Sequence, residues 1–166
     1  FILDKEEGLF ISSNEKKFDI QKNKNSQYII EPNEKYKNEI SLDDNKQVVS
    51  SYYVFPGVEV EGKENYEEIK DFSNFLTLLT SKKQVIIEGS DSSGKTALLK
   101  QAYLSLIGTY VPIYLNVDTI VKKDPETVLK NAFAKQYGDK SVDYEKYLQI
   151  DKDKKIILID DLSKSQ

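Results

Sequence analysis

The feature that most constrains this chain is the segment from Gly89 to Thr96, which reads Gly-Ser-Asp-Ser-Ser-Gly-Lys-Thr. It matches the pattern G-x-x-x-x-G-K-[ST] in full. A short apolar run rich in β-branched residues, Gln84 to Glu88, comes directly before it, as a buried strand requires. Good helix formers with regularly spaced apolar residues follow, from Ala97 to Leu106. The sequence therefore predicts a strand, a glycine-bounded loop and a helix, in the order found in α/β folds.

A loop of this kind is suited to phosphate groups. Its backbone N–H groups and the positive end of the following helix would surround a polyphosphate. The ammonium group of Lys95 would reach the β- and γ-phosphates, and the hydroxyl of Thr96 would hold Mg²⁺. A chance match in a solvated turn is the alternative interpretation, which the flanking strand and helix disfavour. The predicted nucleotide-binding residues are Gly89, Ser90, Asp91, Ser92, Ser93, Gly94, Lys95, Thr96 and Ala97.

A second motif near the end of the sequence supports the first. Residues 155–161 are a lysine, four aliphatic residues and the acids Asp160 and Asp161. Four consecutive aliphatic residues suit a central parallel strand that is buried on both faces. The acids then lie at its carboxyl end, where open α/β sheets bind ligands. We predict that Asp160 holds Mg²⁺ together with Thr96. Asp161 would orient or deprotonate the attacking water, which makes Lys95, Asp160 and Asp161 the catalytic candidates. The alternative for either acid is an ordinary turn residue.

Composition excludes several kinds of chemistry. The 166 residues include no cysteine and no histidine, so disulfides, cysteine nucleophiles, histidine triads and the usual zinc sites are ruled out. All 24 basic residues are lysines, so the chain cannot supply an arginine finger. A net charge of −4 argues against a broad nucleic-acid-binding face. No apolar run is long enough to span a membrane, and we expect a cytoplasmic location.

The first part of the sequence indicates a small β-rich unit. Strands near residues 9–11 and 18–20 flank a turn, and residues 27–30 are a third strand candidate. Residues 32–47 are polar and are interpreted as a linker or weak helix. We therefore expect a β-rich appendage and linker over residues 1–50, followed over residues 51–166 by part of a nucleotide-binding domain.

The second part alternates between predicted helices and strands. Tyr66, Ile69, Phe72, Phe75, Leu76 and Leu79 have helical spacing, which predicts one helix over residues 64–80. A second parallel strand is expected over residues 110–117, with Pro112 near its start. Asp124, Pro125 and Gly138 predict a helix over residues 125–137. Residues 142–150 predict a further short helix. The expected fold class is thus a parallel sheet flanked by helices, of the phosphate-loop NTPase type but with an incomplete core.

The segments GSDSSGKT, VPIYLNV and KIILIDDLSKSQ together resemble the phosphate-loop ATPases of the signal-transduction type with numerous domains (STAND). The resemblance is closest to bacterial multi-domain versions in which the ATPase follows a calcineurin-like metallophosphoesterase, and it covers about residues 53–166. It implies a phosphate cradle around Lys95 and Thr96 and a Mg²⁺-linked acid at Asp160. The chain differs from the family pattern at Ser92, where the loop often has a glycine. We also expect an internal piece of a larger protein, because a phosphate-loop sheet normally needs further strands after the acid-tipped one.

The leading hypothesis is a module that binds ATP, or GTP, with Mg²⁺ and hydrolyses it slowly as a regulatory switch. Its expected partners are a nucleoside triphosphate, other domains of the parent protein and, with nucleotide bound, further copies of itself. A nucleotide or small-molecule kinase is one alternative, although such enzymes usually bring arginines to a lid. A truncated interaction module that is not an enzyme is the other.

Overall fold

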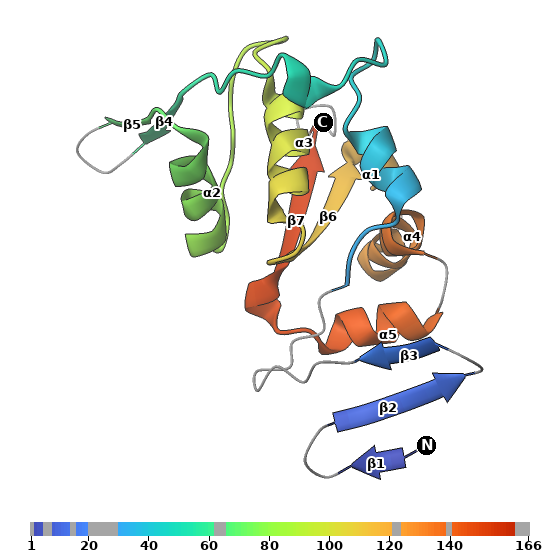
Figure 1. Cartoon of the computed structure of the whole chain (residues 1–166). Coiled ribbons are helices and arrows are strands. Elements are labelled where there is room, and N and C mark those ends of the chain that lie inside the picture. Colours follow the sequence, from blue (N-terminus) through green and yellow to red (C-terminus); the bar gives the residue numbers. More distant parts are fainter. Residues whose placement is uncertain are drawn as a thin grey trace.

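The structure is a computed structural model, and it describes residues 2–4, 8–13, 16–19, 30–61, 66–120, 124–138 and 141–161 (Figure 1). The α-helices are α1 (Glu34–Ile40), α2 (Phe72–Ser81), α3 (Lys95–Leu106), α4 (Pro125–Tyr137) and α5 (Ser141–Gln149). The strands are β1 (Ile2–Asp4), β2 (Gly8–Ser13), β3 (Lys16–Asp19), β4 (Val58–Glu61), β5 (Tyr66–Ile69), β6 (Val111–Asn116) and β7 (Lys155–Asp160). Short 3₁₀ turns are η1 (Val49–Ser51), η2 (Val117–Thr119) and η3 (Lys152–Lys154).

At the centre of the fold, β6 and β7 form a parallel pair, with Asn116 opposite Asp160 at the carboxyl end. Side chains alternate between the two faces of the pair. On one face Tyr114 and Leu158 pack into a core cluster with α3. On the other face Ile113 packs into a second cluster with α4 and α5. Helices therefore cover both faces of β6, as is typical of parallel strands.

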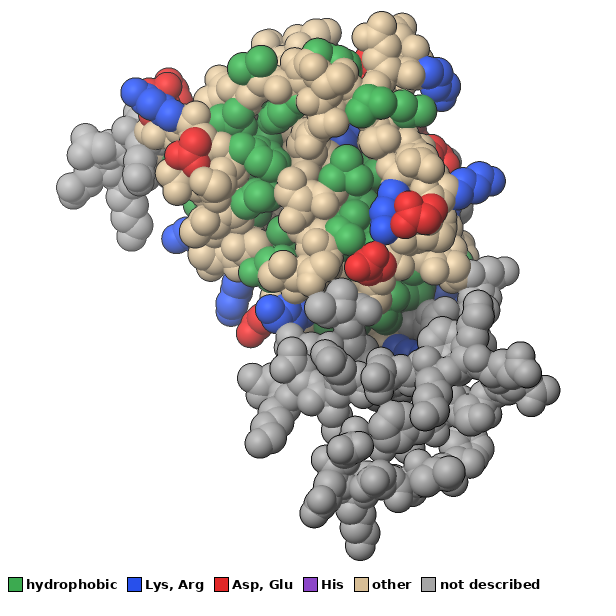
Figure 2. Space-filling model, in the orientation of Figure 1, with side chains coloured by type: hydrophobic (Ala, Val, Ile, Leu, Met, Phe, Trp, Pro, Cys, Tyr) green, Lys and Arg blue, Asp and Glu red, His purple; other side chains and the backbone are tan. Residues whose placement is uncertain are grey.

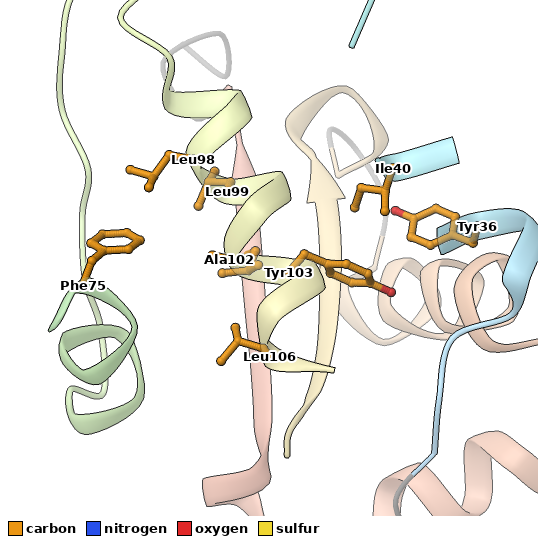
Figure 3. Close-up of a cluster of buried hydrophobic side chains, with 9 residues drawn as sticks. Tyr36, Ile40, Phe75, Leu98, Leu99, Ala102, Tyr103 and Leu106 are labelled. Carbon is orange, nitrogen blue, oxygen red and sulfur yellow. The ribbon is translucent and has the colours of Figure 1, made fainter. Parts of the chain in front are cut away.

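The first cluster is built around α3 (Figure 3). This helix presents a buried stripe with the spacing of one helix face, made of Leu98, Leu99, Ala102, Tyr103 and Leu106. Phe75 of α2 lies on one side of the stripe, and Tyr36 and Ile40 of α1 lie on the other (Figure 3). Phe75, Ala102 and Tyr103 are fully buried. α3 is thus held from two sides as well as against the sheet.

The helix predicted over residues 125–137 is confirmed as α4, which packs into the second cluster. Asp124 caps α4 by accepting the Thr127 N–H at 2.9 Å, Pro125 occupies the first turn, and Gly138 follows the last residue. Aromatic rings of α4 and α5 fill the space between these helices: Phe133 stacks on Tyr137 with ring centroids 4.8 Å apart, and contacts Tyr147 at 5.0 Å. The short helix predicted before β7 is also present as α5.

Side chains of α4 cover the edge of β6 that faces away from β7. The Gln136 side chain accepts the Tyr114 N–H at 3.0 Å and donates to the Tyr114 carbonyl at 2.7 Å. The Tyr137 hydroxyl donates to the Pro112 carbonyl at 2.6 Å. A bare strand edge would leave these backbone groups unpaired. The amide of Gln136, which is 1% exposed, therefore takes the place of a neighbouring strand.

The strand predicted over residues 84–88 is wrong. Residues 84–90 form no strand and run from the end of α2 to the loop before α3 (Figure 1). Ile87 packs against the α3 cluster, whereas Ile86 is 68% exposed. The run of apolar and β-branched residues predicted a buried strand. It carried no information about whether a strand lies beside it to accept its backbone hydrogen bonds.

Two further predictions need correction. Residues 64–80 are not one helix: β5 pairs with β4 in antiparallel register, and α2 begins only after Asp71, whose carboxylate accepts the Asn74 N–H at 2.8 Å. The N-cap at Asp71 sets the start of the helix, although the apolar spacing continues on both sides of it. The strand β7 is not buried on both faces, because Ile157 and Ile159 are 49% and 39% exposed. α4 packs on β6 and leaves this face of β7 open.

In the first part of the chain, β2 and β3 form the predicted antiparallel pair, and β1 adds a strand that was not predicted. The third strand candidate, residues 27–30, lies outside the described residues except for its last one. The polar stretch 32–47 contains a well-formed helix, α1, whose N-cap Asn33 accepts the Tyr36 N–H at 2.9 Å. On the face shown in Figure 2, hydrophobic side chains gather in the middle of the described surface, and most charged ones lie around its margin.

Candidate functional site

The segment before α3 forms a tight loop with two left-handed residues. Ser92 has φ of 61° and Gly94 has φ of 88°, and Gly94 directly precedes the first helical residue. At Gly89 a Cβ atom would lie 2.8 Å from the Ser93 Oγ atom, closer than real contacts allow. Gly94 therefore allows the left-handed conformation that the loop needs, and Gly89 leaves room for the Ser93 side chain. A side chain at position 89 would therefore require the Ser93 side chain to move.

The ammonium group of Lys95 lies inside this loop. It donates to the carbonyl oxygens of Gly89 at 2.8 Å and Ser90 at 2.7 Å, and lies 3.4 Å from the Ser93 Oγ atom. Neutral carbonyl groups are weaker partners for an ammonium group than an anion is. Lys95 is thus held by the loop in a position from which it can exchange carbonyl partners for a phosphate oxygen.

The N-terminus of α3 is open to an anion. Gly94 has no side chain to cap the helix, and the first turn contains no acidic residue. The first N–H groups of a helix have no partners within the helix, and the helix dipole concentrates positive potential there. Thr96 lies in this first turn and is exposed, and Ala97 is half-buried. The loop residues Ser90, Asp91, Ser92, Ser93 and Gly94 are all exposed. The carboxylate of Asp91 therefore faces solvent.

At the end of β7, Asp160 is buried, with 5% of its surface exposed. One of its oxygens, Oδ2, accepts the Tyr114 hydroxyl at 2.5 Å, and the other, Oδ1, accepts the Asp161 N–H at 3.0 Å. Asp161 is half-buried and has φ of 61°, in the left-handed region that few non-glycine residues adopt. Burial raises the pKa of the Tyr114 hydroxyl, and its bond to Asp160 raises that pKa further, so the phenol stays a protonated donor.

The topology brings the two motifs to the same end of the molecule. The N-terminus of α3 lies at the same end of the fold as the carboxyl ends of β6 and β7 (Figure 1). Ile156 and Leu158 pack against the α3 cluster, and Asp160 follows them at the same spacing, so its side chain lies on the face that α3 covers. Lys95, Thr96 and Asp160 therefore share one end and one face of the parallel pair.

These residues fit a magnesium ion bound together with phosphate. Among the residues that the structure describes, no three carboxylates gather into a cluster that would hold a metal by itself. Mg²⁺ needs no such cluster, because it is usually bound by one or two carboxylates, waters and substrate phosphates. Thr96 offers a hydroxyl in the first turn of α3, and Asp160 offers a buried carboxylate at the end of β7. They would act as ligands only when the phosphate groups are present.

Two residues that sequence reasoning missed complete the surroundings of Asp160. Tyr114 contacts its carboxylate, and Gln136 binds the backbone of Tyr114. The alternating pattern of β6 could have indicated which face Tyr114 occupies, but no motif pointed to its hydroxyl. Gln136 lies on the buried face of α4, where a polar residue is unusual.

A hollow of about 510 Å³ lies beside this network, between α1, α4 and the carboxyl end of β6. Tyr114 forms part of its wall, next to Tyr36, Asn116 and Lys100. Glu39 and Lys135 pair across its rim at 2.9 Å, and Lys100 donates to the Leu42 carbonyl at 2.9 Å. The lining of the hollow includes Tyr114, whose hydroxyl donates to Asp160, and does not include Asp160 itself.

Comparisons with protein-family models, with curated proteins and with solved structures find no match to this chain. None of the helices in the described part of the chain combines the length and apolar character that crossing a membrane needs. The chain is a mixed α/β protein with a small parallel sheet; a lysine-containing loop precedes α3, and a buried acid ends β7.

Proposed function

We propose that this chain binds ATP, or GTP, together with Mg²⁺ at the loop Gly89–Thr96, as part of a regulatory NTPase of the STAND type. The observation that carries the proposal is the Lys95 ammonium group, which the loop carbonyls hold at the uncapped N-terminus of α3. The position of Asp160 at the same end of the sheet supports it. Slow hydrolysis would switch the arrangement of attached domains or copies of the chain, in the cytoplasm.

Each residue has a defined role in this proposal. The loop N–H groups and the first turn of α3 bind the phosphates, and Lys95 neutralises the charge that develops on the transferred phosphoryl group. Thr96 and Asp160 would hold Mg²⁺, which supplies further neutralisation of the phosphate charge when bound. Asp161 would orient the attacking water or accept its proton. Since the sequence contains no arginine, these residues supply no arginine finger, and we expect turnover to be slow.

The test is titration calorimetry of the chain with ATP and with GTP, with Mg²⁺ present. Lys95→Ala removes the ammonium group and should weaken binding at least tenfold, because a charge-assisted contact to phosphate is lost. Lys83→Ala is the matched control, since it removes the same charge from an exposed position before the loop. Circular dichroism should show the same fold for both variants.

Three outcomes would contradict the proposal. Absence of nucleotide binding by the wild-type chain would leave the loop without its ligand. Equal binding by the wild type and Lys95→Ala would show that any nucleotide binds elsewhere. A loss of affinity in Lys83→Ala as large as that in Lys95→Ala would point to a general effect of net charge.

A second candidate function is phosphoryl transfer to a small acceptor. The hollow beside Tyr114 favours it, because an acceptor bound there would lie near the carboxyl end of β6. The fate of the γ-phosphate separates the two functions. Release of inorganic phosphate from ATP by the chain alone supports hydrolysis, whereas turnover that appears only when an acceptor is added supports transfer.

A further inference from the structure

Both oxygens of the buried Asp160 carboxylate have donors. Oδ2 accepts the Tyr114 hydroxyl at 2.5 Å, and Oδ1 accepts the N–H of the next residue, Asp161, at 3.0 Å. A carboxylate with one donor can still rotate about its Cβ–Cγ bond, but two donors on different oxygens fix the plane of the group. Each oxygen keeps a further lone pair for a metal ion. The orientation of Asp160 therefore depends on where Tyr114 places its hydroxyl.

Tyr114 is itself held in place. The Gln136 side chain binds both its N–H, at 3.0 Å, and its carbonyl, at 2.7 Å. The last turn of α4 is in turn bound by Asn33, which donates to the Gln136 carbonyl from its backbone at 2.8 Å and from its side chain at 2.9 Å. The ring of Tyr114 packs against the α3 cluster. These contacts fix the position of the Tyr114 hydroxyl. A fixed donor of this kind can orient the side chain that accepts from it.

We propose that Tyr114 is a positioning residue that orients the Asp160 carboxylate for Mg²⁺ and thereby sets how strongly nucleotide binding depends on that ion. This inference rests on the proposed function, and it adds a residue that no phosphate-loop pattern contains. Tyr114 does not touch the nucleotide in this proposal. Its hydroxyl contributes only through Asp160, so its loss affects the magnesium-dependent part of binding and leaves the contacts of the loop unchanged.

The experiment compares the wild type, Tyr114→Phe and Tyr137→Phe by titration calorimetry with ATP, in EDTA and over a series of Mg²⁺ concentrations. Tyr137→Phe is the matched control, because it also removes one buried tyrosine hydroxyl that bonds to β6, here to the Pro112 carbonyl at 2.6 Å. In EDTA all three proteins should bind ATP equally within about twofold. In Tyr114→Phe the Mg²⁺ concentration needed for half of the affinity gain should rise about tenfold, the effect of losing a hydrogen bond to a charged group.

The outcomes separate this inference from the proposed function. If the wild type binds no ATP, the proposed function fails, and this inference fails with it. If the wild type shows Mg²⁺-dependent binding and Tyr114→Phe behaves like Tyr137→Phe, the function stands and the role of Tyr114 is refuted. A lower Mg²⁺ requirement in Tyr114→Phe would refute it as well, because it would mean that the hydroxyl competes with the ion.

Discussion

Gly94 offers a quantitative test of the loop conformation. Its φ of 88° lies in the left-handed region, and a Cβ atom added there would meet nothing within 4 Å. The cost of Gly94→Ala is therefore backbone strain alone, about 1–2 kcal/mol for an L-residue in this region. The reduced freedom of the unfolded chain offsets about 0.4–1 kcal/mol of this. The net loss of stability is about 1 kcal/mol, which lowers Tm by about 2–4 °C in a domain of this size.

Gly108 provides a control that is matched in φ, in exposure and in the space around a Cβ atom. It has φ of 87°, is exposed, and would also place a Cβ atom in open space, but it lies in the turn after α3. Gly108→Ala should therefore lower Tm by the same amount. Only Gly94→Ala should weaken ATP binding, by tenfold or more, because relief of its strain rotates the peptide that carries the Lys95 N–H. Gly94→Asn should recover part of the stability, since asparagine tolerates this region.

Thermal unfolding and titration calorimetry on the three variants provide both readouts. The reasoning is refuted if Gly94→Ala is as stable as the wild type, because φ at position 94 would then not be left-handed. It is also refuted if both alanine variants lose ATP affinity equally, since the loss would then follow stability and not the loop.

Two further predictions concern stability alone. Asp124→Ala removes the cap of α4 and should cost about 0.5–2 kcal/mol in urea unfolding, and Asp124→Asn, which keeps a capping oxygen, should cost less; equal losses would mean that charge and not capping matters. Alkaline pH should destabilise the fold, because burial raises the pKa of Tyr53 and Tyr147 to about 12, above the usual value near 10. A raised folded pKa gives stability that is present below about pH 10 and is lost as pH rises toward 12. A free energy of unfolding that does not fall as pH rises from about 10 toward 12 would contradict this.

The sequence alone determined the elements whose signals are local. Asp124, Pro125 and Gly138 set the ends of α4, because caps and the constraints of proline and glycine act within one turn of the chain. The pattern G-x-x-x-x-G-K-[ST] likewise predicted a loop followed by a helix, and α3 begins at Lys95. The apolar runs at 110–117 and 155–160 predicted strands, and both are present as a parallel pair.

Only the tertiary structure decided which segments have partners. Residues 84–88 have the composition of a strand and form none, and Ile157 and Ile159 have the composition of a buried core and are half-exposed. The contact between Tyr114 and Asp160, and the clamp that Gln136 places on Tyr114, join residues that are far apart in the chain. Hydrogen bonds of this kind depend on the distance between elements after packing, and no local pattern records that distance. The loop at residues 89–96 was therefore predictable from its own residues, whereas the hydrogen-bond partners of Asp160 were not.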